Sequence, residues 1–316
     1  MSKRTLALLA ATAASAIYAA NHSIAKGIMP HYIKPFGFIL LRVLGAAILF
    51  WAISFFGPKE KIAKKDWGRL LLCAIFGMVI NMLMFFKGLS LSTPINSSVV
   101  ITISPVLLLI LSAIMIKEKM TQQKVFGIII GLAGALALIL FGDKQQLNAP
   151  NIPLGNTLFI INATSYAVYL IMVKPLSERY SVITLMKWLF LFAVFINLPI
   201  TISEFNEVNW TELPGNVILK MGFVVVGTTF LTYLFNVFAL KELKASTVGA
   251  FIYLQPVLTT FFAILLGADS LTVLMVVAAS LIFLGVYLST KKVKTKRLKE
   301  SPVKTFTKLV KEKIKT

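Results

Sequence analysis

Ser104-Pro105-Val106-Leu107 and Gln255-Pro256-Val257-Leu258 are two similar stretches, and each lies in the middle of a long apolar run. A proline inside a helix removes one backbone hydrogen bond, so in a membrane it persists where neighbouring helices or a polar cavity satisfy the freed carbonyl. We therefore predict a buried, broken helix at each proline, with Pro105 and Pro256 as hinges. Matched interruptions in two halves of an apolar chain indicate a binding site between the halves.

The similarity extends beyond the prolines at the same offset of 151 residues. Gly134 corresponds to Gly285, and Glu118 corresponds to Asp269. Matches between leucines or valines arise by chance in so apolar a chain, so the prolines, the glycines and the acidic pair carry the argument. The chain is predicted to hold a first five-helix repeat over 1–145, a second over 146–290 and a basic tail over 291–316.

Composition places the chain among membrane proteins. Apolar residues make up 58% of the 316 residues and charged residues 14%, with a mean hydropathy of +0.85. The net charge of +20 does not indicate a nucleic-acid partner, because Lys and Arg are confined to short segments without a basic stripe beside stacking aromatics. Cys73 is the only cysteine, which excludes an intramolecular disulfide and a cysteine metal site.

Apolar stretches of about 20 residues can cross the hydrocarbon core of a bilayer as helices. The first follows Lys3-Arg4 as in a signal peptide, but its pattern Tyr18, Asn21, Lys26 returns as Tyr166, Tyr169, Lys174, so we interpret it as the first helix of a repeat. The fold class is therefore all-α, a polytopic membrane protein with ten transmembrane helices as two inverted five-helix repeats. The predicted spans are 5–25, 35–56, 68–89, 94–116, 123–141, 153–173, 182–203, 216–239, 246–267 and 270–290.

Charge predicts the orientation of these spans. Most Lys and Arg lie in alternate connections and in the tail, so the positive-inside rule places both termini in the cytoplasm. Because each repeat has five crossings, the second is inverted, which puts Glu118 in a cytoplasmic turn and Asp269 in an outer one. Inverted repeats suit alternating access to a central site.

Polar side chains inside spans are candidates for that site. Arg42 lies about two turns into the second span without a carboxylate in neighbouring spans, so it either snorkels to the outer surface or faces an anionic substrate group. Lys187, near the start of the seventh span, snorkels more easily. The alternative for the amides and phenols is that they tie helices together by hydrogen bonds. The candidate substrate-binding residues are Asn21, His22, Arg42, Asn81, Phe85, Ser104, Tyr166, Tyr169, Tyr233, Asn236, Tyr253 and Gln255.

Several chemistries have no support in the sequence. No Asp or Glu lies at the centre of a span, which leaves His22 as the only central titratable candidate. There is no helix with paired His and Glu, no Gly-rich phosphate loop and no Ser, His and Asp set. We therefore expect no enzyme activity, no metal and no cofactor.

The tail over 291–316 is basic. Val303, Phe306, Leu309, Val310 and Ile314 form an apolar stripe among its lysines, which suggests a short helix on anionic lipid, with a solvated tail as the alternative. The expected partners are thus a small-molecule substrate and the lipid bilayer. The sequence leaves a homodimer open.

With these residues assembled, the chain resembles the drug/metabolite transporter superfamily, most closely its EamA-like ten-helix members. The resemblance rests on Tyr18-Ala19-Ala20-Asn21 with Lys26, on Arg42, on Phe86-Lys87-Gly88-Leu89 before Ser104-Pro105-Val106, on Lys117-Glu118-Lys119 and on Gln255-Pro256-Val257 with Asp269. It covers residues 5 to 290.

The resemblance implies a secondary transporter of the bacterial inner membrane that exports amino acids or other small polar metabolites by alternating access. The alternatives are a sugar-nucleotide or phosphorylated-metabolite exchanger, and a non-transporting membrane scaffold that acts through the tail. The motifs specify the fold better than the substrate.

Overall fold

The computed structural model describes residues 2–115, 121–141, 143, 146–242, 251 and 254–290. These residues form helices with short connections, and the only β pairing among them is an isolated bridge between Gln146 and Ala149. The elements of the first half are α1 (Lys3–Ile28), α2 (Pro35–Ser54), η1 (Lys64–Asp66), α3 (Trp67–Ala74), η2 (Ile75–Ile80), α4 (Asn81–Leu91), α5 (Pro94–Ile101), α6 (Ser104–Met115) and α7 (Gln122–Phe141). Those of the second half are α8 (Ile152–Ser177), α9 (Val182–Asn206), η3 (Trp210–Glu212), α10 (Gly215–Gly222), η4 (Phe223–Leu231), α11 (Thr232–Glu242), α13 (Leu254–Leu265) and α14 (Val273–Thr290).

The helices confirm the predicted all-α membrane fold with two five-helix repeats. The first repeat is α1, α2, α3-η2-α4, α5-α6 and α7, and the second is α8, α9, α10-η4-α11, α13 and α14. Six helical segments of the described chain are long and apolar enough to cross a membrane, and three shorter apolar helices accompany them. The span expected over 246–267 is described only from Leu254 onward, apart from Phe251, and Glu118 and the tail over 291–316 lie outside the described residues.

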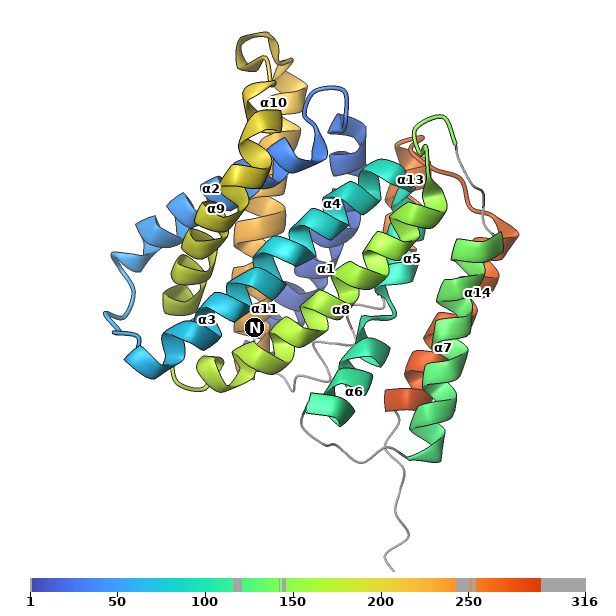
Figure 1. Ribbon diagram of the computed structural model, residues 1–316, viewed down its shortest axis with the longest axis horizontal. Coiled ribbons are helices and arrows are strands. Elements are labelled where there is room, and N and C mark those ends of the chain that lie inside the picture. The colour runs from blue at the N-terminus through green and yellow to red at the C-terminus, as the bar shows by residue number, and fades with distance from the viewer. Residues whose placement is uncertain are drawn as a thin grey trace, which may run out of the picture.

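Helices at equivalent positions of the two repeats pack against each other. α2 lies beside α9, and α7 lies beside α14 (Figure 1). The first helix of each repeat also packs on the third pass of the other, α1 on α11 and α8 on α4. The repeats are therefore interleaved, so that residues at the centre of the bundle come from both.

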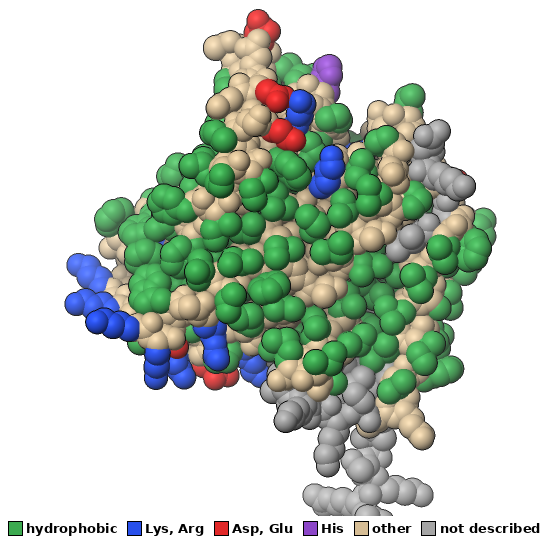
Figure 2. Space-filling view, in the orientation of Figure 1, with side chains coloured by type: hydrophobic (Ala, Val, Ile, Leu, Met, Phe, Trp, Pro, Cys, Tyr) green, Lys and Arg blue, Asp and Glu red, His purple; other side chains and the backbone are tan. Residues whose placement is uncertain are grey.

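The surface divides into a hydrophobic band and two polar ends. Figure 2 shows apolar side chains over most of the visible face, with Lys and Arg gathered at its lower edge. We call that end the basic face, because it carries the start of α3 and the end of α8 with Lys64, Lys65, Arg69, Lys174 and Arg179. The end with Lys26, Lys34 and Asp269 is the opposite face.

The first proline interrupts its span as predicted, with a different partner for the freed carbonyl. α5 ends at Ile101 and α6 begins at Ser104, so Pro105 is the second residue of a new helix. Pro105 has no N–H to donate to the Ile101 carbonyl. The Ser104 hydroxyl donates to that carbonyl instead, at 2.6 Å, so the adjacent residue replaces the neighbouring helices or polar cavity that we expected.

The second proline is the third residue of α13 (Leu254–Leu265) and is buried. At the 151-residue offset, the interruption at Thr102 and Ile103 corresponds to Tyr253 and Leu254. Tyr253 lies outside the described residues, and Leu254 is the first residue of α13.

A second irregularity, which the sequence did not predict, recurs in both repeats. The third pass of each contains a π-helix, η2 in the first and η4 in the second. The repeat offset of 151 places Ile75–Ile80 on residues 226–231, inside η4. Because π-helices are frequent at functional sites, this matched pair is a candidate position for the site.

Candidate functional site

Arg42 is buried in the interior of the bundle. Its side chain extends from α2, 6% of the residue is exposed, and its Nε donates to Thr229 Oγ1 of η4 at 2.5 Å. The guanidinium carbon lies 5.4 Å from the centroid of the Phe86 ring. Thr229 in turn donates to the Val224 carbonyl at 3.0 Å, which fixes its lone pairs toward Arg42. Arg42 therefore points inward and does not snorkel.

The charge of Arg42 has no carboxylate partner among the described residues. The groups within electrostatic range of the guanidinium are the phenols of Tyr18 and Tyr233. Nε is its only nitrogen with a described protein acceptor, so Nη1 and Nη2 are not bonded to the described part of the chain. A buried cation without an opposite charge beside it can bind an anion.

Tyrosines from three helices gather beside Arg42. The rings of Tyr166 and Tyr169 on α8 lie 5.8 Å apart, and both interact electrostatically with Tyr18 of α1. The Tyr233 hydroxyl of α11 donates to the Met78 sulfur at 3.5 Å. Tyr18, Tyr166 and Tyr233 are each only partly buried. We call this group the Arg42 cluster, and it consists of Tyr18, Arg42, Met78, Phe86, Tyr166, Tyr169, Thr229 and Tyr233.

The two π-helices position the cluster by pseudo-symmetric contacts with the first helix of the other repeat. At η2, Gly77 leaves room for the Tyr169 ring, because a Cβ on Gly77 would lie 2.5 Å from Tyr169 Cδ2. The Ser165 hydroxyl donates to the Phe76 carbonyl at 2.6 Å. At η4, the residue equivalent to Gly77 is Thr228, which donates to Asn21 Oδ1 at 3.2 Å. Each π-helix is thus held by polar contacts across the repeat boundary.

Asn21, His22 and Phe85 lie against the cluster. The Nδ1 atom of His22 shares a hydrogen bond of 2.5 Å with the Ser97 hydroxyl, and its ring centroid lies 5.4 Å from that of Phe85. The ring centroid of Phe85 lies 5.2 Å from that of Phe86, and the Phe86 ring faces the Arg42 guanidinium. The structure therefore brings these predicted residues together with Arg42.

Other predicted site residues have local partners. Asn81 Nδ2 donates to the Asn162 carbonyl at 3.3 Å, and Asn162 Nδ2 donates to the Asn81 carbonyl at 2.7 Å, which ties α4 to α8. Ser104 bonds the carbonyl freed by Pro105. Asn236 on α11 and Gln255 on α13 are half-buried, and Tyr253 lies outside the described residues.

Sequence reasoning missed Thr228, Thr229 and Met78. Thr228 and Thr229 are equivalent to Gly77 and Met78 at the 151-residue offset, and their hydroxyls lie inside an apolar span. These two features could have identified the threonines from the sequence.

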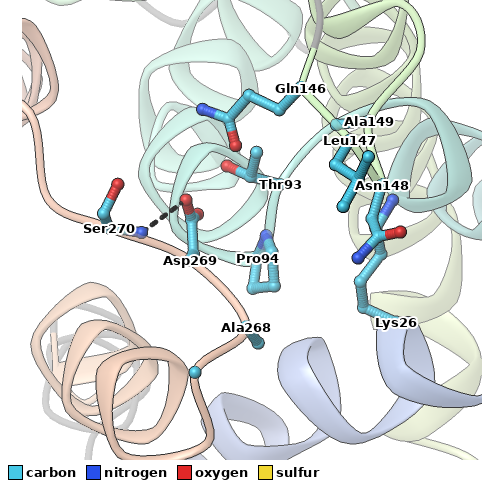
Figure 3. Close-up of a pocket in the computed structure, with 11 residues that line it drawn as sticks. Lys26, Thr93, Pro94, Gln146, Leu147, Asn148, Ala149, Ala268, Asp269 and Ser270 are labelled. Atoms are coloured by element: carbon cyan, nitrogen blue, oxygen red, sulfur yellow. Dashed lines mark hydrogen bonds between the residues drawn. The ribbon is translucent and has the colours of Figure 1, made fainter.

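A second polar site lies at the opposite face. A pocket of about 320 Å³ is lined by parts of both repeats, with Lys26 and Thr93 from the first and Asp269 from the second. Figure 3 shows Asp269 and Lys26 on either side of Pro94. Lys26 Nζ donates to the carbonyls of Leu89 and Ser90 at 2.7 and 3.0 Å, so it caps the end of α4.

Asp269 caps the beginning of α5 across the repeat boundary. Its Oδ2 accepts from the Ile95 N–H at 3.0 Å and its Oδ1 from the Ser270 N–H at 2.8 Å. Burial raises the pKa of this carboxyl above its ordinary value, against the opposing effect of the hydrogen bonds from Thr93, Ile95 and Ser270 and of the Lys26 charge.

Gly267 sets the direction of the loop that carries Asp269. It has a φ of 62°, in the left-handed region that favours glycine. The Ala268 N–H donates to the Ala263 carbonyl at 2.8 Å and the Gly267 N–H to the Ile264 carbonyl at 3.1 Å, which is a Schellman motif at the end of α13. The motif turns the chain back over α5.

Comparison with known proteins gives the same architecture. One solved crystal structure superimposes with a TM-score of 0.61 over 91% of this chain and 98% of its own, at 18% sequence identity, a likeness in fold. An "uncharacterized transporter" of Archaeoglobus fulgidus is 28% identical over 263 residues, 83% of this chain and 90% of its own. "Uncharacterized transporter YyaM" of Bacillus subtilis is 26% identical over 252 residues, 77% and 80%.

The family comparison covers both repeats. The model of the EamA-like transporter family matches residues 5–140 and again residues 153–291. Together these segments include every described element of the Arg42 cluster and of the pocket at the opposite face, apart from the connection over 146–149. The chain belongs to the EamA-like transporter family.

Proposed function

We propose that this membrane transporter is a secondary carrier that exports small metabolites, amino acids or other small polar compounds, by alternating access to the Arg42 cluster. The observation that supports it is a buried cation held between helices of both repeats, with no carboxylate partner in the described part of the chain. Inverted repeats that meet at such a site can expose it to one side of the membrane and then to the other.

The proposed location is the bacterial inner membrane with both termini in the cytoplasm. The gathering of Lys and Arg at the basic face supports that orientation, because positive residues are retained on the cytoplasmic side. The opposite face, with Lys26 and Asp269, is then the outer end of the transport path. Pro105 and Pro256 remain the proposed hinges.

Counterflow in reconstituted proteoliposomes tests the function directly. Vesicles loaded with one unlabelled metabolite at a time should accumulate the same labelled compound transiently, and a panel of amino acids, organic acids and neutral polar metabolites should contain at least one such substrate. Arg42→Gln should abolish this accumulation, whereas Lys187→Gln should retain it, because Lys187 Nζ lies over the Trp51 ring at 5.2 Å. Accumulation by Arg42→Gln equal to that of the original protein would contradict the proposed site.

A further inference from the structure

The electrostatic balance of the Arg42 cluster indicates the charge of its ligand. The cluster holds one guanidinium, 94% buried, and its other members are phenols, a hydroxyl, a thioether and a phenyl ring. A buried charge is costly unless an opposite charge accompanies it. Among the described residues no carboxylate takes that role, so the counter-charge comes from the solute.

The orientation of the guanidinium suits a carboxylate. The hydrogen bond from Nε to Thr229 anchors one edge of the group, and its central carbon lies 5.4 Å from the centroid of the Phe86 ring. Nη1 and Nη2 remain without a described acceptor and present two parallel N–H donors. Two such donors match the two oxygens of a carboxylate in a bidentate pair.

The cluster offers no charged partner for an ammonium group. A zwitterionic amino acid bound to Arg42 would bring one negative and one positive charge, so the occupied cluster would keep its net charge of one. A monoanion neutralises it. The rings of Phe86, Tyr18 and Tyr233, which lie near the guanidinium, suit an apolar or aromatic body on that anion.

A phosphate ester carries close to two negative charges and calls for a second cation. Lys187 does not supply it. Its Nζ lies over the Trp51 ring, and Trp51 is nine residues after Arg42 on α2, about 13 Å along the helix axis. His22 is engaged with the uncharged Ser97 hydroxyl. The phosphorylated-metabolite alternative therefore has less support than a carboxylate.

We infer that the Arg42 cluster binds monoanionic carboxylates with an apolar or aromatic body in preference to zwitterionic amino acids, neutral solutes and phosphate esters. This inference rests on the proposed transport function and narrows its substrate class. Arg42 is the residue that determines specificity.

Probes with one body and different charges test the inference. The purified full-length protein in detergent is titrated with 3-phenylpropanoate, phenylalanine, 3-phenylpropanamide, 2-phenylethylamine and 3-phenylpropyl phosphate, and the shift of its thermal midpoint gives the affinity of each. The monocarboxylate should bind at least about tenfold more tightly than any of the others, since a hydrogen-bonded charge pair outweighs a neutral contact. Equal or tighter binding of phenylalanine, of the phosphate or of the amide would overturn the inference.

Variants separate the role of Arg42 from a loss of folding. Arg42→Gln should lose the preference for the carboxylate, and its elution profile on size exclusion in detergent should match that of the original protein, which reports an intact fold. Arg42→Lys should keep a reduced preference, because it retains the charge without the planar pair of donors. Lys187→Gln is the matched control and should behave as the original protein. Retention of the full preference in Arg42→Gln would overturn the assignment.

The two proposals fail in different ways. If counterflow occurs with amino acids but not with monocarboxylates, the transport function stands and the charge selectivity is wrong. If no compound of the panel gives counterflow, the transport function fails.

Discussion

At the residue scale, Asp269 connects the two repeats at the opposite face, and its pKa gives a test of how it is held. Because burial raises the pKa of this carboxyl in the folded state, folding takes up a proton as the pH falls from neutral through the raised pKa toward the ordinary value of 3.8. The original protein therefore gains stability over that range relative to an Asp269→Asn variant, which has no such titration. Thermal midpoints at pH 7 and pH 4 in detergent should show the difference moving in favour of the original protein at pH 4.

The control for this prediction is Asp269→Ala. It leaves the Ile95 N–H without its acceptor at both pH values and should cost about 1 kcal/mol. A difference between the original protein and Asp269→Asn that is the same at both pH values would show that the carboxyl is not held in the buried position described.

At the scale of elements, the contact between α7 and α14 depends on glycine. A Cβ on Gly285 would lie 2.4 Å from the Gly131 nitrogen and 2.6 Å from the Gly127 carbonyl oxygen, which are backbone atoms that cannot move aside. Gly285→Ala should therefore separate the two helices and lower stability by about 1–3 kcal/mol. The measurement is the thermal midpoint of the purified variant.

Gly222→Ala is the matched control, because a Cβ at the end of α10 meets nothing within 4 Å. That substitution should be neutral or slightly stabilising, since alanine favours the helix over glycine. Equal destabilisation by both substitutions would contradict the close approach of α7 and α14.

At the scale of the whole molecule, the sequence predicted the architecture because long-period signals are strong in an apolar chain. Ten apolar stretches and the 151-residue offset between Pro105 and Pro256 predicted two five-helix repeats, and the helices confirm them. The matched glycines Gly134 and Gly285 prove to lie where α7 and α14 approach closely.

The site was only partly predictable. Buried polar residues such as Arg42 and His22 were identifiable from their position inside spans, and the structure brings them together through Phe85 and Phe86. The π-helices could not be predicted, because a π-helix differs from an α-helix by one extra residue in a turn and has no characteristic amino-acid composition. The partner of the carbonyl freed by Pro105 was also missed, because a serine beside a proline has several local acceptors.

The central claim is that one site between the two repeats becomes accessible from each side of the membrane in turn. Asn236 is half-buried on α11, one turn after Tyr233, so a cysteine at this position (Asn236→Cys) can report access to the site. The substitution is made in a Cys73→Ala background, because Cys73 is the only cysteine of the sequence and is buried. A membrane-impermeant thiol reagent should label this cysteine in right-side-out and in inverted vesicles, and an excess of a transported solute should slow both reactions. Labelling from one side only, unaffected by solute, would contradict the account.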